Sequence, residues 1–292
     1  MHEDEFQLDV DLVRGVIAES LPDLAGLPVE PLASSGTVHR MFRLGPGLVI
    51  RVPRAPQFVR AFERETTLLP LMPHDLPLAI PRLVFAGSST ESFPAPWSVM
   101  EWIEGKPLSE GSLADAPADA AALGEFVRAM RNVSVDGPIS QNQRGRQLAA
   151  NDARMRESIV AVAAEFDPGR LTKLWDRALE APPWSGNVTW IHGDLLPGNL
   201  LVTDGQIRAV IDFGECARGN PTVDLLPSWW VFDDPAARAV FLDEAGADKA
   251  ARDRAVGWAL SSAAGALAYY VQSNVAFADQ ARQTLHRLVA AI

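Results

Sequence analysis

The chain has 292 residues, of which 48% are hydrophobic and 22% charged, so it can bury a core and is not expected to be disordered. Its 26 Lys and Arg against 37 Asp and Glu give a net charge of −11, which argues against a basic surface for nucleic acid. The single cysteine, Cys216, excludes a disulfide framework and a thiolate zinc site and is typical of a reducing compartment. The acidic start lacks the regions of a signal peptide, so we expect a cytoplasmic protein.

The first third of the chain mixes helical and extended patterns. Apolar residues at helical spacing predict helices over residues 9–21 and 57–69. Short extended runs flanked by turn residues predict strands at 27–32, 40–44, 48–52, 80–86 and 97–103. Together these elements predict a small antiparallel sheet with one crossing helix.

The rest of the chain is richer in alanine and in helical patterns. Helices are predicted over residues 116–131 and 148–166, an extended island follows at 188–213, and helices resume to the end. Residues 258–278 are small and apolar, but Ser, Gln and Asn interrupt them too early for a membrane span, so they predict a buried helix.

This order of elements predicts an α+β fold with two lobes. The first is a small, antiparallel β-rich lobe over residues 1–103, and the second is a larger, mainly helical lobe over residues 104–292. No repeat at a fixed period and no low-complexity tract interrupts this organisation.

Three polar side chains in the second lobe stand at the ends of apolar runs: Asp194, Asn199 and Asp212. Phosphoryl transfer needs one carboxylate that accepts the proton of the attacking hydroxyl, and an amide oxygen and a second carboxylate that hold magnesium against the phosphates. The spacing of these three residues matches the catalytic and metal loops of protein kinases. Each residue alone is typical of a turn, and it is the combination that favours phosphoryl transfer.

His192 stands two residues before Asp194 and has two interpretations. It either hydrogen-bonds the backbone and fixes the loop, which we favour, or it ligates a metal. A metal-dependent hydrolase that uses His192 and Asp194 would need a further His or Cys at ligand spacing, and the sequence has none there.

With these motifs the chain resembles the aminoglycoside phosphotransferase family of kinase-like enzymes. The resemblance extends through almost the whole chain and rests on His192-Gly193-Asp194 with Asn199, on Ile211-Asp212-Phe213-Gly214 and on residues 219–225. The family includes antibiotic kinases for aminoglycosides and macrolides, and metabolic kinases of the choline, homoserine and methylthioribose types. The resemblance implies a bilobal protein-kinase-like fold, ATP or GTP as co-substrate, Mg²⁺, and a small acceptor that carries a hydroxyl group.

The resemblance also implies roles for the matching positions. Asp194 would be the catalytic base beside His192, and Asn199 and Asp212 would be the magnesium ligands. Asp224 matches a buried Asp that braces the catalytic loop in the family, and a helix N-cap is an equally open interpretation.

Nucleotide binding is expected in the first lobe. Arg51 stands where kinases usually carry Lys, and Glu65 lies on the helix that should supply its ionic partner. The alternative is an ion pair that serves packing alone. Arg54 is a second candidate for the phosphates.

Two further segments of that lobe are candidates for contact with the nucleotide. Met100, Glu101 and Trp102 would belong to the hinge that reads the purine edge, although an apolar strand alone also explains them. Ser35 and Gly36 would belong to a flap over the phosphates, although ordinary hairpin chemistry explains them as well.

Several aromatic residues follow in the helical lobe. Their default interpretation is core packing, because aromatic side chains supply large buried areas, and the functional alternative is a wall for the acceptor. These residues are Trp229, Trp230, Trp258, Tyr269 and Tyr270.

We therefore predict a small-molecule O-phosphotransferase that moves the γ-phosphate of ATP or GTP to a hydroxyl, with an aminoglycoside-like antibiotic as the expected acceptor. The alternatives are a metabolic kinase of the choline, homoserine or sugar type, and a nucleotide-binding pseudokinase that acts as an interaction module. Arg51 favours the pseudokinase, and the complete set of Asp194, Asn199 and Asp212 opposes it. The excess of carboxylates predicts a cationic or neutral acceptor, and we expect a monomer or homodimer with no membrane or nucleic-acid partner.

Overall fold

The computed structural model describes residues 4–32 and 38–291. The chain divides into two compact units. The first comprises Met1–Met72, Ile80–Glu104 and Asp212–Glu215, and the second comprises Pro73–Ala79, Gly105–Ile211 and Cys216–Ile292. The segment Asp212–Glu215 lies far along the sequence, yet it belongs to the same unit as the N-terminal strands.

The first unit is built on a sheet in which all described neighbours pair antiparallel, in the order β1-β2-β3-β5-β4. This confirms the predicted small antiparallel sheet. The described strands are β1 (Val29–Leu32), β2 (His39–Leu44), β3 (Leu48–Pro53), β4 (Leu83–Gly87) and β5 (Trp97–Glu101).

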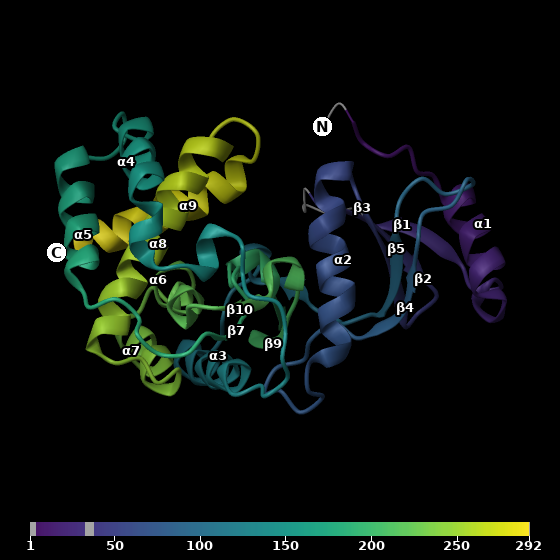
Figure 1. Cartoon of the computed structure of the whole chain (residues 1–292), viewed down its shortest axis with the longest axis horizontal. Coiled ribbons are helices and arrows are strands. Elements are labelled where there is room, and N and C mark those ends of the chain that lie inside the picture. Colours follow the sequence, from purple (N-terminus) through teal and green to yellow (C-terminus); the bar gives the residue numbers. More distant parts are fainter. Residues whose placement is uncertain (1–3, 33–37, 292) are drawn as a thin grey trace. The chain divides into compact units, whose positions relative to one another are not determined.

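The two faces of this sheet carry different helices, α1 (Val10–Ser20) on one and α2 (Val59–Leu68) on the other (Figure 1). Side chains alternate along a strand, so β3 turns Ile50 and Val52 into the apolar core that contains α1, while Arg51 points to the opposite face. The alternation therefore places a buried arginine beside α2, where Glu65 meets it.

The second unit is mainly helical and carries two small antiparallel sheets. The sheets are β10-β7 and β6-β8-β9, with β6 (Lys106–Pro107), β7 (Thr189–Ile191), β8 (Leu200–Thr203), β9 (Gln206–Val210) and β10 (Ala217–Gly219). The helices are α3 (Ala116–Arg131), α4 (Asp152–Ala161), α5 (Pro168–Glu180), α6 (Pro227–Trp230), α7 (Pro235–Glu244), α8 (Lys249–Tyr270) and α9 (Val275–Ala290).

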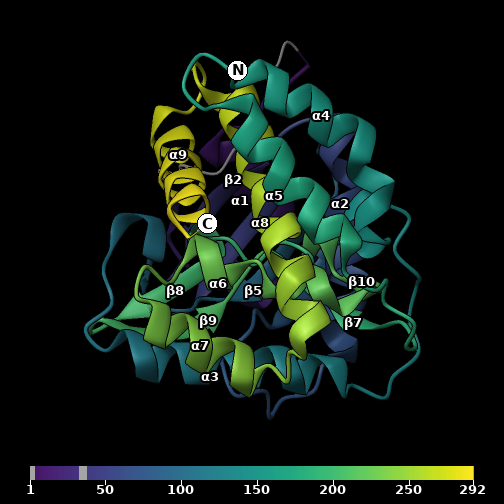
Figure 2. The ribbon, with the colours of Figure 1, turned by 90° about the vertical axis from the view of Figure 1, so that its left-hand side faces the viewer.

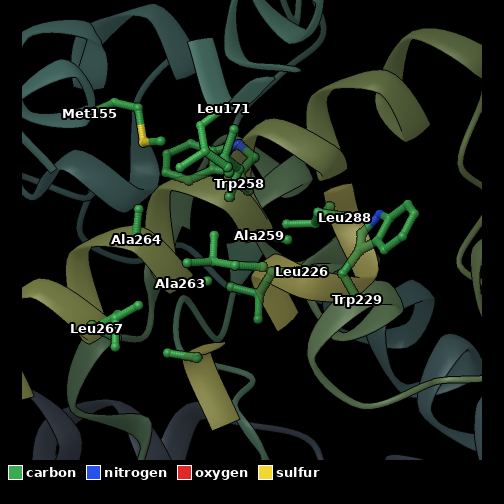
Figure 3. Close-up of a cluster of buried hydrophobic side chains, with 14 of the residues drawn as sticks. Met155, Leu171, Leu226, Trp229, Trp258, Ala259, Ala263, Ala264, Leu267 and Leu288 are labelled. Atoms are coloured by element: carbon green, nitrogen blue, oxygen red, sulfur yellow. The ribbon is translucent and has the colours of Figure 1, made fainter. Parts of the chain in front are cut away.

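Helix α8 forms the centre of this unit and packs against α4, α5 and α9 (Figure 2). Its buried face is built from Trp258 and a run of small residues, and Leu171, Leu226 and Leu288 reach this face from neighbouring segments (Figure 3). Small side chains let the neighbouring helices approach α8 closely. None of the described helices is long and apolar enough to cross a membrane.

The predicted single helix over residues 258–278 is wrong at its centre. The chain ends α8 at Tyr270 and begins α9 at Val275, because Asn274 caps the new helix by accepting the N–H of Phe277 at 3.2 Å. The aromatic prediction also needs a correction. Trp229, Trp230 and Trp258 are buried as expected, but Tyr269 is 73% exposed and is not part of the core; Tyr270 is partly buried.

Candidate active site

The loop that carries Asp194 starts directly after strand β7. His192 is fully buried, and Gly193 has a φ of 81°, a left-handed backbone that glycine adopts without a steric penalty. The turn at Gly193 brings Asp194 out of the buried strand, and its side chain keeps 22% of its surface exposed. The carboxylate is therefore accessible, whereas the residues before it are not.

Asp224 fixes this turn from within the unit. Its Oδ2 accepts the backbone N–H of His192 at 2.7 Å, and its Oδ1 accepts that of Gly193 at 2.8 Å. Burial raises the pKa of Asp224, while these two N–H groups and the positive charge of Arg131 act in the opposite direction. The carboxylate thus braces the loop rather than capping a helix, since Leu226 and not Asp224 stands at the N-cap of α6.

The imidazole of His192 is enclosed by backbone groups. Nδ1 accepts the N–H of Asp194 at 3.2 Å, and Nε2 lies 3.0 Å from the carbonyl oxygen of Ile211. These partners assign the neutral tautomer with the proton on Nε2. His192 therefore connects the loop of Asp194 to the residue that directly precedes Asp212.

Asn199 holds Asp194 from the other end of the loop. Its Nδ2 donates to the carbonyl oxygen of Asp194 at 2.8 Å and to Oδ2 of the Asp194 carboxylate at 3.3 Å. Because these bonds use the amide nitrogen, they orient Oδ1 of Asn199 as the acceptor available to a cation. The Asn199 carbonyl also accepts the N–H of Ile211 at 2.9 Å.

Sequence reasoning missed Arg144, which lies in the short helix Gln143–Gly145 between α3 and α4. Its guanidinium forms an ion pair with Oδ1 of Asp194 and donates to the carbonyl oxygen of Gly193 at 3.0 Å. No periodic pattern marks this residue, because it lies in a polar segment with no apolar residue from Ser140 to Gln147.

In the first unit, Arg51 and Glu65 form a buried ion pair at 2.7 Å, with 8% and 0% of their side chains exposed. Burial acts to lower the pKa of Arg51, but the nearby carboxylates of Glu65 and Asp212 outweigh it and raise that pKa. Nε of Arg51 and Oε2 of Glu65 are buried without a hydrogen-bond partner among the described residues. Both groups retain unused hydrogen-bonding capacity, which is costly for buried groups and typical of a binding site.

Glu65 also holds the segment that follows Asp212. Its Oε1 accepts the backbone N–H of Phe213 at 3.1 Å, and Arg64 donates to the carbonyl oxygen of Gly214 at 3.0 Å. Asp212 itself has a φ of 65°, which is rare for a residue with a side chain and is costly unless the surroundings enforce it. Helix α2 therefore fixes the backbone that presents the Asp212 carboxylate.

His39 is a second residue that sequence reasoning missed. Its Nδ1 lies 3.0 Å from Nη2 of Arg51, and its ring packs tilted against Phe62 with centroids 6.0 Å apart. Burial lowers the pKa of His39, and the positive charges of Arg51 and Arg54 lower it further. A neutral His39 accepts a hydrogen bond from Arg51 and thereby fixes the guanidinium.

The predicted hinge residues lie at the end of β5. Glu101 donates its N–H to the carbonyl oxygen of Arg82 at 2.9 Å, and Trp102 donates its N–H to that of Gly47 at 2.8 Å. Met100 is buried, and its sulfur lies 3.5 Å from Arg51. The N–H groups of Glu101 and Trp102 are therefore used within the unit and are not free to read a purine edge.

The other residues considered in the sequence analysis make other contacts or lie outside the described residues. Ser35 and Gly36 lie outside the described residues. Arg54 pairs with Glu5 at 4.0 Å and contacts the carbonyl oxygen of His39 at 3.5 Å, so the N-terminal segment engages this second phosphate candidate. Cys216 is buried, as expected for an inert thiol.

The predicted site residues thus fall into two groups, each held within its own unit. His192, Asp194 and Asn199 are joined by hydrogen bonds in the second unit, and Arg51 and Glu65 are joined with the Asp212 segment in the first. Among the described residues no three His, Cys, Asp or Glu side chains cluster as a metal site would require. The available donors are hard oxygens of one amide and of carboxylates, which suits Mg²⁺, since this ion binds few protein ligands and completes its shell with water and phosphate oxygens.

Comparison with known proteins gives a family and a fold. The chain matches the model of the phosphotransferase enzyme family over residues 29–258. No curated protein sequence matches it.

Solved structures of phosphotransferases are similar along nearly the whole chain. The GDP complex of aminoglycoside 2'-phosphotransferase-IIIa has a TM-score of 0.71 and 17% identity, covering 98% of this chain and 100% of that one. Macrolide 2'-phosphotransferase from Brachybacterium faecium has a TM-score of 0.62 and 24% identity, covering 95% and 97%. Aminoglycoside phosphotransferase APH(4)-Ia, bound to AMP-PNP and hygromycin B, has a TM-score of 0.63 and 18% identity, covering 96% and 98%. These likenesses confirm the predicted kinase-like fold.

Proposed function

The chain belongs to the phosphotransferase enzyme family, and we propose that it transfers the γ-phosphoryl group of ATP or GTP to a hydroxyl of a small-molecule acceptor. The observation that supports this most strongly is the loop of Asp194. Asp224, His192 and Asn199 hold its backbone by hydrogen bonds, and the loop still leaves the carboxylate partly exposed. Such a rigid mounting is what a general base requires, because proton transfer depends on a fixed distance.

In the proposed reaction, Asp194 accepts the proton of the acceptor hydroxyl. The oxygen of that hydroxyl forms a bond to the γ-phosphorus, the bond from this phosphorus to the bridging oxygen breaks, and the nucleoside diphosphate leaves. His192 and Asp224 do not touch the substrate in this scheme, and they act by positioning the loop.

Asn199 and Asp212 would hold Mg²⁺, with the amide Oδ1 and the carboxylate as donors. Bound there, the ion would neutralise negative charge on the phosphate oxygens. Arg51 would add a fixed positive charge for the donor phosphates, and the buried partners Glu65 and His39 keep its guanidinium in place. The hinge around Met100, Glu101 and Trp102 would contact the base through groups other than the two N–H donors that the carbonyl oxygens of Arg82 and Gly47 already accept.

For the acceptor we propose an antibiotic-like molecule with amino and hydroxyl groups, which is cationic or neutral. The net charge of −11 attracts cations over long range. Similar structures were obtained with kanamycin and with hygromycin B, which supports testing this class first. Such an activity would be an antibiotic-resistance activity, and the single cysteine and the nucleotide co-substrate favour the cytoplasm as its location.

One structural feature favours a second acceptor class, in which the molecule is more apolar. Tyr270 of α8 packs edge-on against Phe277 at 5.2 Å between centroids, and Phe277 stacks on Trp230 at 5.7 Å. Burial raises the pKa of Tyr270, the negative charges of Tyr269 and Asp194 raise it further, and the positive charge of Arg144 opposes them. This aromatic group would suit a macrolide-like acceptor or a metabolic alcohol with an apolar body.

The test is nucleoside diphosphate release with magnesium and ATP or GTP, measured with aminoglycosides, macrolides, choline, homoserine and sugars as acceptors. We expect stimulation by at least one acceptor and a phosphorylated product in equal amount. A cationic acceptor should bind more weakly as salt rises, since exposed charges are screened over about 10 Å at 0.1 M salt. A pseudokinase would bind nucleotide, but none of these acceptors would stimulate its release of nucleoside diphosphate.

A further inference from the structure

Arg131 is the last residue of α3, and its guanidinium is partly buried in the second unit. Nη1 donates to the carbonyl oxygen of Ala245 at 2.6 Å, at the end of α7, which lies beside α3 (Figure 2). Nη2 donates to the carbonyl oxygen of Pro221 at 3.4 Å, and Nε is buried without a hydrogen-bond partner among the described residues. These hydrogen bonds go to backbone oxygens, which do not neutralise the charge, and such a cation is costly unless a negative charge lies nearby.

That negative charge is supplied by Asp224, which is 2% exposed. Pro221 begins the short helix Pro221–Leu225 in which Asp224 lies, so the bond to its carbonyl oxygen holds Arg131 against the same segment. Burial lowers the pKa of Arg131, and the charge of Asp224 opposes this effect. In turn, the charge of Arg131 opposes the rise that burial causes in the pKa of Asp224. The two charges therefore stabilise each other.

The groups that face Asp224 leave Arg131 as its source of positive charge. The short helix Pro221–Leu225 packs against α3, α8, β7 and the helix Gln143–Gly145. Among the described titratable groups on and next to these elements, His192 and Arg131 act on Asp224. Both ring nitrogens of His192 have backbone partners that hold the imidazole in its neutral form, so it brings no charge.

The support that Asp224 gives to the loop of Asp194 depends on its own charge. As a carboxylate it accepts one N–H on each oxygen, that of His192 at 2.7 Å and that of Gly193 at 2.8 Å. When Asp224 takes up a proton, one oxygen becomes a hydroxyl, which has a proton of its own to donate and is a poorer acceptor. One of the two N–H groups that precede Asp194 then loses its hydrogen bond.

We propose that Arg131 is a positioning residue for phosphoryl transfer, which acts through Asp224. The inference rests on the proposed function. The guanidinium holds the segment that carries Asp224 and keeps this carboxylate ionised, so that both of its oxygens brace the loop of Asp194. A structural role is the alternative, because a cation at the C-terminal ends of α3 and α7 also stabilises both helices. The alternative predicts effects of Arg131 that do not depend on the protonation of Asp224.

The first test needs no substrate and measures the free energy of unfolding in urea at about pH 8 and about pH 5.5. Arg131→Gln removes the charge but keeps a donor for one carbonyl oxygen, so folded Arg131→Gln protonates Asp224 at a higher pH than the folded wild type does. We expect this variant to be less stable than the wild type at the higher pH and the difference to shrink at the lower one, because a protonated Asp224 does not need the cation. Arg131→Lys keeps the charge and should lose a similar amount of stability at both pH values.

Two controls show whether the effect is transmitted through Asp224. In the Asp224→Asn background position 224 cannot take up a proton, so Arg131→Gln should cost the same stability at both pH values. Arg128→Gln, one turn earlier on α3, removes an exposed arginine that pairs with Glu244 at 3.3 Å, and its effect should be the same with Asp or Asn at position 224. The proposal is overturned if Arg131→Gln destabilises the Asp224 protein equally at both pH values, or if the difference shrinks in the Asp224→Asn background as well.

The second test measures kcat and KM with magnesium and ATP or GTP, and with kanamycin, or another member of the panel that the wild type phosphorylates, as acceptor. Relative to the wild type, we expect Arg131→Gln to lose on the order of tenfold more kcat at about pH 5.5 than at about pH 8, a part of the roughly 10²-fold that a misplaced catalytic group can cost. The KM for the nucleotide should not change. The loss of activity thus grows in acid while the loss of stability shrinks, and the structural alternative does not predict this pair of changes.

A ratio of the two kcat values that stays constant with pH would contradict the proposal. Failure of the proposed function has a different signature, since the wild type would then phosphorylate no acceptor of the panel. The unfolding test would still decide whether Arg131 sets the charge of Asp224.

Discussion

Oδ2 of Asp224 accepts the backbone N–H of His192 at 2.7 Å, which joins two buried residues that stand 32 positions apart in the sequence. The other oxygen of the same carboxylate accepts the N–H of Gly193 at 2.8 Å. One buried side chain thus accepts the N–H groups of both residues that precede Asp194. The position of the proposed base depends on a residue that lies behind the loop.

Replacing Asp224 should therefore affect both stability and catalysis. Asp224→Ala leaves two buried N–H groups without their acceptor, each at a cost of about 1–3 kcal/mol, so we expect the free energy of unfolding to fall by about 2–6 kcal/mol. The kcat should fall too, with little change in nucleotide affinity. Asp224→Asn keeps one acceptor oxygen and should be intermediate in urea unfolding. Unchanged stability of Asp224→Ala would contradict this role.

Because His39 is buried with a lowered pKa, we expect the folded protein to lose stability in mild acid. Burial and the charges of Arg51 and Arg54 lower its pKa in the folded state, so the unfolded chain binds a proton at a higher pH than the folded chain. The stabilising contribution is complete above the unfolded pKa of about 6.5 and is lost as pH falls below it, by at most about 1.4 kcal/mol per pH unit. His39→Gln should lose less stability between pH 7 and 5 than the wild type does. His74→Gln, at an exposed position, is the control and should follow the wild type.

Variants of the buried pair Arg51 and Glu65 can distinguish a structural role of Arg51 from a role in nucleotide binding. Arg51→Met leaves the Glu65 charge buried and unpaired, which costs about 3–5 kcal/mol of stability. Arg51→Met combined with Glu65→Gln removes that charge and should recover part of the stability, but it should still bind nucleotide more weakly. Arg51→Lys should keep part of the affinity. Calorimetric titration with magnesium nucleotide measures the nucleotide affinity of each variant. Wild-type affinity in the double variant would show that Arg51 serves packing alone.

The two proposed magnesium ligands should contribute unequally to magnesium-dependent nucleotide binding. Asp212 offers a full negative charge and Asn199 only an amide dipole, so we expect Asp212→Ala to weaken magnesium-dependent nucleotide binding more than Asn199→Ala does. Asn199→Ala should instead lower kcat, because it removes the bonds that hold Asp194. Titrations with and without magnesium distinguish the two variants. Equal losses of affinity would count against this ranking.

The sequence was sufficient to predict those parts of the fold that depend on local periodicity. The extended run over residues 48–52 predicts strand β3 almost with its observed bounds, and the helical pattern of residues 116–131 predicts α3 with its observed bounds. The break after Tyr270 was missed because the interrupting residues Gln272, Ser273 and Asn274 were read only as evidence against a membrane span, and the apolar pattern resumes after them. The signal was Asn274, an N-cap residue followed by a new helix.

In the candidate site, the residues that form a recognisable motif could be proposed from the sequence, whereas their partners could not. Arg144 and His39 meet Asp194 and Arg51 only through tertiary packing, and nothing in their own neighbourhood marks them. The hydrogen bonds of the Glu101 and Trp102 N–H groups could not be predicted from the sequence either. Their acceptors, the carbonyl oxygens of Arg82 and Gly47, are brought close only by the way the strands and turns meet.

The most direct test of the central claim compares wild type with Asp194→Asn in the presence of magnesium nucleotide and the acceptor panel. Asn keeps the size of the side chain and an acceptor oxygen but cannot take up a proton, so the fold and nucleotide binding should be retained. We predict that the wild type yields phosphorylated acceptor and nucleoside diphosphate in equal amounts, and that Asp194→Asn lowers kcat by about 10²–10⁴-fold. Transfer by Asp194→Asn at the wild-type rate would contradict the account.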